Sequence, residues 1–316
     1  TPLDIRSFNG TRTTGGVSYN LGARIRPNDE GGLDIGSTST DILLQSMVDN
    51  GDMVFGVRHA SSNVERMRIE ADGDVGIGET APLGKLHVKT GDSGISSVSG
   101  GANELVLEGS GDTGMCIVGG TSSSAQILFG DSGSSFRGAI NYDNGSDSLI
   151  ISTSATERMR IDSAGHVTKP SQPAVHAYLN TTQSNIPTGF TTVQLNAEIY
   201  DVNSDFNTST YTFTAPVTGK YLVTMNLILT DVDTAFQWIY LVGVASNRYY
   251  YLNQIDPRML AQDGTWSWVG SSLVDMDAND TFIMRTRSSA HGAAQMDIAG
   301  GTANATETTM TMTLLS

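Results

Sequence analysis

The sequence predicts an all-β protein, with an elongated, repetitive β stalk built as an intertwined trimer and a jelly-roll sandwich head. The residues ERMRI at 65–69 return in the same order at 157–161, which indicates a duplicated unit. The chain of 316 residues contains 35 Gly and is 38% hydrophobic, a composition that favours many short strands and turns. All three Trp lie after Pro173, where the apolar runs also lengthen.

Residues 1–40 are predicted to form a separate N-terminal region. Apolar pairs such as Leu3/Ile5 and Leu33/Ile35 alternate there with Gly, Asn and Asp. This pattern is typical of strands of about three to five residues.

Residues 41–169 are predicted to form the stalk. Each ERMRI copy reads as a strand in which every second residue is apolar, and a short turn follows, Asp72-Gly73 in the first copy. A hairpin this short is marginally stable alone, so its apolar stripe must pack on something else, which we take to be other copies of the chain. The expected interface residues in the stalk are Met67, Ile69, Met159 and Ile161.

The middle of the stalk, residues 90–138, is rich in Gly and Ser. Apolar runs nevertheless return at 104–108, 115–118 and 126–129. A disordered linker would not show this recurrence, so the segment is predicted to be β-structured.

Residues 170–316 are predicted to form one compact head, joined to the stalk by a stiff segment with two prolines in four residues. Eight or nine strands connected by long loops fit a double-sheet jelly roll. The expected strands cover residues 174–179, 191–196, 210–214, 219–229, 236–244, 248–253, 265–276, 281–288 and 308–315.

The run YTFTAPVTGKYLV at residues 211–223 resembles the signature of the complement one-q and tumour necrosis factor superfamily. The shared features are an aromatic residue, Ala-Pro, a two-residue turn, Gly, and a Tyr that begins a long strand. The resemblance covers about residues 173–316 and implies a threefold trimer. The candidate interface residues in the head are Tyr211, Phe213, Tyr249, Tyr251, Met312 and Leu314.

The stalk repeat, with GDVGIGETAP at 73–82 and KLHV at 85–88, resembles a repeat of bacteriophage tail fibres and appendages. This resemblance implies a homotrimeric virion fibre, bound through its N-terminal region to other virion proteins and through its distal head to a host surface glycan or outer-membrane protein. Two alternatives remain open. One is a capsid-bound head fibre or decoration trimer, and the other is a polysaccharide depolymerase, which would need paired carboxylates in a cleft.

Four head residues are candidates for receptor binding. Trp266 and Trp268 follow an Asp-Gly turn, Arg258 precedes it, and Tyr250 belongs to a run of three tyrosines. Aromatic side chains and Arg dominate recognition surfaces, so we expect these four on an exposed platform.

Candidate ion ligands are few. Asp231 with Asp233, and Asp275 with Asp277, have the alternate spacing that lets carboxylates converge on a structural Ca²⁺, although solvated loop acids show the same spacing. Threefold symmetry could also bring three copies of His87, or three copies of His166, together on an axis. No other cofactor is expected.

Several functional classes are disfavoured. A net charge of −15 opposes binding to nucleic acid, and no run of about 18 apolar residues exists to insert in a membrane. Cys116 is the only cysteine, so no intrachain disulfide can form. The GDSG runs at 91–94 and 130–133 lack a His and Asp context for a serine nucleophile, so no catalytic residue and no enzyme activity are predicted.

Overall fold

The protein is described by a computed structural model that covers residues 4–6, 11–14, 17–28, 31–37, 42–46, 50–59, 62–246, 248–259, 264–289 and 295–316. For residues before 50 only the backbone is described, apart from Leu44. The described chain is all-β, as predicted, and its one helix is the short 3₁₀ helix η1 (Pro257–Met259). No described helix is long and apolar enough to cross a membrane. The chain divides into two compact units, Thr1–Cys116 and Ile117–Ser316.

The first unit contains two five-stranded sheets. The first has the order β1-β3-β4-β5, with β2 paired to β3. Because the whole of β5 pairs with β4, this sheet continues past residue 40 and the predicted boundary between 40 and 41 divides it. Its strands are β1 (Asp4–Arg6), β2 (Thr11–Thr14), β3 (Val17–Asn28), β4 (Gly31–Ser37) and β5 (Ile42–Ser46).

The second sheet of this unit has the order β10-β9-β8-β7-β6. Its first hairpin, β6–β7, is antiparallel, whereas β8, β9 and β10 pair in parallel. The strands are β6 (Met53–His59), β7 (Ser62–Ile69), β8 (Val75–Ile77), β9 (Leu86–Lys89) and β10 (Leu105–Glu108).

The second unit begins with an antiparallel meander, β11-β12-β13-β14-β15. Its strands are β11 (Ser124–Asp131), β12 (Ser134–Asp143), β13 (Ser148–Thr153), β14 (Thr156–Ile161) and β15 (Val167–Thr168). The two ERMRI copies therefore occupy equivalent places, one on β7 and the other on β14.

Both copies of the repeat contain a β-bulge at the same residue. Arg66 has no opposite residue on β6 and Arg158 has none on β13, because the Glu before and the Met after each of them face consecutive residues of that strand. The strict alternation that the sequence suggests is therefore interrupted. The extra residue brings a Glu and the Arg three positions later to one face: Arg68 Nε lies 2.8 Å from Glu65 Oε1. The equivalent pair in β14, Arg160 and Glu157, is bidentate as well, at 3.0 and 2.6 Å.

The turns after the two copies are also alike, and they differ from the predicted two-residue turn. In each, three residues close the loop, and only the last of them, Gly73 (φ +95°) or Gly165 (φ +85°), has a positive φ. The Glu70 N–H donates to Asp74 O at 2.9 Å and the Gly73 N–H donates to Glu70 O at 3.0 Å. A three-residue loop needs glycine only at this closing position, so the residue before it keeps an ordinary backbone angle.

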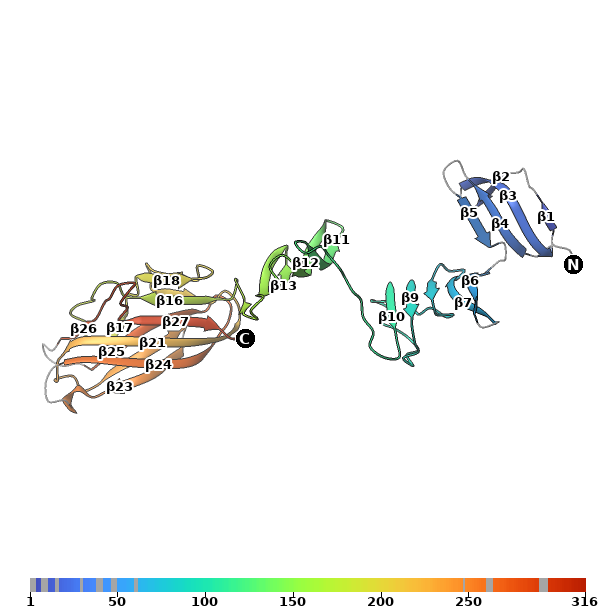
Figure 1. Ribbon diagram of the computed structural model, residues 1–316. Helices are drawn as coiled ribbons and strands as arrows, with labels where there is room; N and C mark the ends of the chain where they lie inside the picture. Colours follow the sequence, from blue (N-terminus) through green and yellow to red (C-terminus); the bar gives the residue numbers. More distant parts are fainter. Residues whose placement is uncertain are drawn as a thin grey trace. The chain divides into compact units, whose positions relative to one another are not determined.

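The head is a jelly-roll sandwich of two six-stranded sheets, which confirms the predicted fold (Figure 1). The β21 sheet has the order β18-β16-β27-β21-β24, with β26 paired to β21. Its strands are β16 (Ala174–Tyr178), β18 (Ala197–Asp201), β21 (Gly219–Val232), β24 (Gly264–Met276), β26 (Asp297–Ile298) and β27 (Thr309–Leu314).

The β25 sheet has the order β19-β20-β25-β22-β23, with β17 paired to β25. Its strands are β17 (Gly189–Thr192), β19 (Phe206–Asn207), β20 (Thr212–Thr214), β22 (Ile239–Ala245), β23 (Arg248–Ile255) and β25 (Thr281–Ser288).

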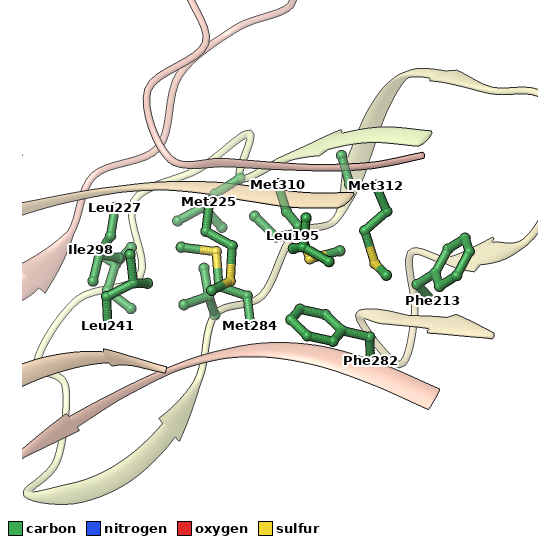
Figure 2. Close-up of a cluster of buried hydrophobic side chains, with 14 of the residues drawn as sticks. Leu195, Phe213, Met225, Leu227, Leu241, Phe282, Met284, Ile298, Met310 and Met312 are labelled. Carbon is green, nitrogen blue, oxygen red and sulfur yellow. The ribbon is translucent and has the colours of Figure 1, made fainter. Parts of the chain in front are cut away.

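The head core fills the space between these sheets. Figure 2 shows methionine and leucine side chains of β21 and β27 meeting Leu241, Phe282 and Met284 of the facing sheet. Every second residue of β21 from Tyr221 to Leu229 is fully buried, and burial of each such side chain stabilises the fold by roughly 1.5–3 kcal/mol. These β21 residues are Tyr221, Val223, Met225, Leu227 and Leu229.

Candidate functional site

The stalk strands carry apolar side chains that one chain does not cover. Among the described residues between 50 and 169, the only buried hydrophobic side chains are Val106 and Ala139. In β11 the consecutive residues Ile127, Leu128 and Phe129 are all exposed. Since consecutive strand residues point to opposite faces, both faces of this strand present apolar surface to solvent.

The four stalk residues expected at subunit interfaces are half-buried. Met67 and Ile69 lie on β7, and Met159 and Ile161 lie on β14, each with part of its side chain still accessible. Their interface role stays a prediction.

The outer face of the β21 sheet also presents apolar side chains. Leu222 faces Leu273 across β21 and β24, and both are exposed. Val269 of β24 is 64% exposed, and Tyr200 of β18 is exposed at the far edge of the sheet. The Thr224–Ser271 pair lies between Leu273 and Val269 along β24, and its two hydroxyls are 2.9 Å apart.

Two of the head residues predicted at the trimer interface belong instead to the protomer core. Phe213 and Met312 have 0% exposure, so neither can contact a partner subunit, and the prediction for them is wrong. Strand alternation turns both inward, where the Phe213 ring lies edge-on to Tyr221 at 5.5 Å. Leu314 packs against the same core and Tyr211 is half-buried in the turn before β20.

The predicted tryptophan platform does not form. Trp268 is 7% exposed and Trp266 packs against the core, because the even-numbered residues of β24 face inward. Tyr250 also packs against the core. Arg258 is exposed on η1, where its Nε and Nη2 donate to Asp256 at 2.9 and 2.6 Å. Placing the two tryptophans on a receptor surface is therefore wrong.

Tyr249 and Tyr251, predicted at the trimer interface, belong to an exposed aromatic cluster on the outer face of the β25 sheet. They are 51% and 46% exposed, and their rings stack with centroids 6.4 Å apart. Tyr240 lies edge-on to Tyr251 at 5.3 Å and contacts Trp238 at 5.3 Å. Phe190 of β17 extends the cluster to Tyr249 at 5.5 Å.

Two arginines of β25 lie in this cluster. The Arg287 guanidinium is 4.8 Å from the Phe190 ring centroid and 5.2 Å from that of Trp238, and its Nη1 donates to Tyr251 Oη at 3.1 Å. Arg285 lies 5.9 Å from the Phe190 centroid and donates to Thr192 Oγ1. We call this surface the aromatic–arginine face. It consists of Phe190, Trp238, Tyr240, Tyr249, Tyr251, Arg285 and Arg287.

The two sheets of the head differ in charge. The strands of the β25 sheet contain Arg248, Arg285 and Arg287 and no Asp or Glu. Within the described residues, neither Arg285 nor Arg287 forms an ion pair with a carboxylate. The β21 sheet is acidic, since its strands carry one lysine, Lys220, against Glu198, Asp201, Asp231, Asp275 and Asp297.

A buried ion network lies in the first unit. In the described part of the chain, Glu79, His87 and Glu108 are the only three potential metal ligands whose ligand atoms all lie within 4.8 Å of one another. Lys89 Nζ lies 2.7 Å from Glu79 Oε2 and 3.5 Å from Glu108 Oε2. The Lys89 hydrogen bond lowers the pKa of Glu79, and the Ser93 backbone N–H lowers that of Glu108.

The two carboxylates of this network are paired with the ammonium group of Lys89, and the His87 ring is not arranged to bind a metal ion. The Leu83 N–H donates to His87 Nδ1 at 3.2 Å, which assigns the proton of the neutral ring to Nε2. That nitrogen lies 3.0 Å from Glu108 Oε2, although the two atoms are not aligned as a hydrogen bond. A protonated Nε2 has no lone pair for a metal. His87 is also fully buried within its own unit, so placing it on a subunit axis is wrong.

The four aspartates predicted to bind Ca²⁺ are not brought together. Asp275 pairs in register with Lys220 at the start of β21, whereas Asp231 lies near its end. Asp233 Oδ1 accepts a hydrogen bond from the Ala235 N–H at 2.7 Å, and Asp277 is exposed. Binding of Ca²⁺ at either pair stays a prediction.

The sequence contained an unused signal for the aromatic–arginine face. Tyr249/Tyr251 and Arg285/Arg287 are each two residues apart, the spacing that places strand residues on one face. No acidic residue occurs in either strand, which sets them apart in a chain of net charge −15. What the sequence lacked was the pairing of β17, β22, β23 and β25 that joins these residues.

Comparison with known proteins gives structural likenesses only. No protein-family model matches the sequence, and no curated protein matches it. Among solved structures, the globular domain of zebrafish complement 1qA is 14% identical, with a TM-score of 0.34 over 46% of this chain and 98% of that one. Murine APRIL at pH 8.5 is 13% identical, with a TM-score of 0.33 over 46% of this chain and 99% of that one.

Proposed function

We propose that this chain is the subunit of a homotrimeric virion fibre whose distal head attaches the particle to the surface of a host cell. The observation that carries the proposal is the apolar surface left open in a single chain, in the stalk strands and on the outer face of the β21 sheet. Exposed apolar patches of this kind mark surfaces that other proteins cover.

The number of copies follows from the two sequence resemblances. The head signature at 211–223 resembles a superfamily whose heads form threefold trimers, and the stalk repeat resembles fibres of bacteriophages. One threefold arrangement serves both parts. The β21 sheet, with Leu222, Val269 and Leu273, is the head surface that we assign to the subunit interface.

The mechanism that we propose is attachment by avidity and not catalysis. Three identical heads on one particle make the second and third contacts intramolecular, which raises the overall affinity by about 10²–10⁴ when the geometry allows simultaneous binding. The N-terminal region is assigned to contacts with other virion proteins, at either the tail or the capsid.

Competition for adsorption tests this function. The purified full-length protein, added in excess to host cells, should reduce adsorption of the virus that carries this chain. The double variant Val269→Asp/Leu273→Asp should compete at least about tenfold less well, because charges on the β21 sheet separate the subunits and remove avidity.

Met259→Asp is the matched control, since Met259 is 85% exposed on η1, outside the proposed interface. It should compete as well as the unmodified protein. Undiminished adsorption at saturating protein would contradict the attachment role.

A further inference from the structure

We propose that the aromatic–arginine face is a binding site for an anionic saccharide. This inference rests on the proposed attachment function and specifies the class of ligand that the head recognises. It gives a different role to Tyr249 and Tyr251, which were predicted at a subunit interface, and it adds Phe190, Arg285 and Arg287, which no sequence motif marks.

The rings form an ordered layer above the sheet. Val242 and Val244, which pair with Tyr251 and Tyr249, are buried although they lie on the outer face of β22. The tyrosine rings therefore cover the strand and present their own surfaces to solvent. Flat exposed rings suit the apolar C–H face of a pyranose, which packs on them by dispersion and area burial.

The arginines add a fixed positive charge to this layer. Arg287 lies over the Phe190 and Trp238 rings and donates to the Tyr251 hydroxyl, so its guanidinium is held before a ligand arrives. A planar guanidinium matches carboxylate and phosphate groups with two parallel hydrogen bonds. Arg285, two residues earlier on the same face of β25, supplies a second charge.

The charge distribution selects an anion. The chain has a net charge of −15, yet the strands of the β25 sheet carry three arginines and no carboxylate. Uncompensated arginines on one sheet of an acidic protein favour an anionic ligand at that sheet. A neutral sugar would leave both guanidinium groups, which donate to the neutral hydroxyls of Thr192 and Tyr251, without an anionic partner.

The site remains accessible in the proposed trimer. The aromatic–arginine face is the outer surface of the β25 sheet, and the proposed subunit interface is the outer surface of the β21 sheet on the opposite side of the sandwich. Subunits that meet through the β21 sheet therefore leave the β25 sheet open. Each particle would present three copies of the site, as avidity requires.

Binding of the full-length protein to three immobilised polysaccharides tests the proposal. The probes are polygalacturonate, which carries carboxylates, a phosphate-bearing teichoic acid, and neutral dextran. We expect binding to one or both of the anionic probes, weaker binding as salt increases, and none to dextran. The two anionic arms distinguish a carboxylate from a phosphate ligand.

Variants locate the site. Arg285→Gln/Arg287→Gln should weaken binding by about tenfold or more, because charge-assisted hydrogen bonds are lost. Tyr249→Ala, at an exposed ring, should weaken it through lost stacking with little effect on folding. Arg137→Gln, at an exposed arginine of β12 outside the head, is the control and should bind as the unmodified protein does.

The outcomes separate this proposal from the attachment function. If neither anionic probe binds, or if both face variants bind as well as the unmodified protein, the proposal is wrong. The proposed function stands in that case, provided that the arginine variant remains trimeric by light scattering and still competes for virus adsorption. If the unmodified protein itself fails to compete, the attachment function has failed instead.

Discussion

At the scale of single residues, the face of the strand on which an aromatic side chain lies decides whether it packs in the core or faces solvent. Phe213 and Tyr249 are both aromatic strand residues of the β25 sheet, yet the first is fully buried and the second is 51% exposed. The difference comes from which face of the strand meets the second sheet.

This difference predicts unequal effects of truncation. Phe213→Ala should lower the free energy of unfolding by about 3–5 kcal/mol, because the core loses packing and gains a cavity. Tyr249→Ala should change it by less than about 1 kcal/mol, since its ring is largely in solvent. Urea unfolding followed by circular dichroism measures both. Equal losses for the two variants would contradict the assignment of faces.

For β24, the sequence already indicated which residues face the core, and the prediction of exposed tryptophans overlooked it. In β24 the polar residues Thr265 and Ser267 alternate with Trp266 and Trp268, which already indicates that the tryptophans face inward. In β23 the run Tyr249-Tyr250-Tyr251 gives no such signal, because all three residues are alike. Only the pairing with β22 shows which of these rings are outside.

At the scale of elements, the duplicated repeat is predictable as two strands and two turns, but its shape is not. A bulge depends on how two strands pair, so the ERMRI letters alone do not reveal that Arg66 and Arg158 lack a partner residue. The same bulge in both copies explains why Glu and Arg recur three residues apart: the bulge places their side chains on one face, where they form a bidentate pair.

The ion network that joins the loop after β8 to β9 and β10 predicts acid sensitivity of the first unit. The pKa values of Glu79 and Glu108 are both below the ordinary value of 4.5. Their contribution to stability is therefore fully present above pH 4.5 and is lost as the pH falls through the lower pKa values of the folded state.

Thermal unfolding between about pH 6 and about pH 3 measures this dependence. The midpoint should fall below pH 4.5, and it should fall less in the double variant Glu79→Gln/Glu108→Gln, which has no carboxylates to protonate there. Asp112→Asn, at an exposed carboxyl outside the network, is the control and should behave as the unmodified chain. An unchanged slope in the double variant would show that the network does not cause the acid sensitivity.

At the scale of the whole molecule, the sequence predicted a jelly-roll head, because strand length and aromatic content change near Pro173. The two compact units divide earlier, between Cys116 and Ile117, so the boundary between residues 169 and 170 stays a prediction. The sheet formed by β1 to β5 was divided wrongly, since β5 belongs with the strands before it. Pairing partners that are distant in sequence decide such boundaries, and strand patterns do not contain them.

The central claim is that this chain buries its exposed apolar surface only when three copies associate. Multi-angle light scattering of the full-length protein tests it most directly. Three chains of 33.5 kDa give a predicted mass of about 100 kDa, and Val269→Asp/Leu273→Asp should shift the mass toward smaller species. If the unmodified protein is folded and stable but has a mass of 33.5 kDa at all concentrations, the account is contradicted.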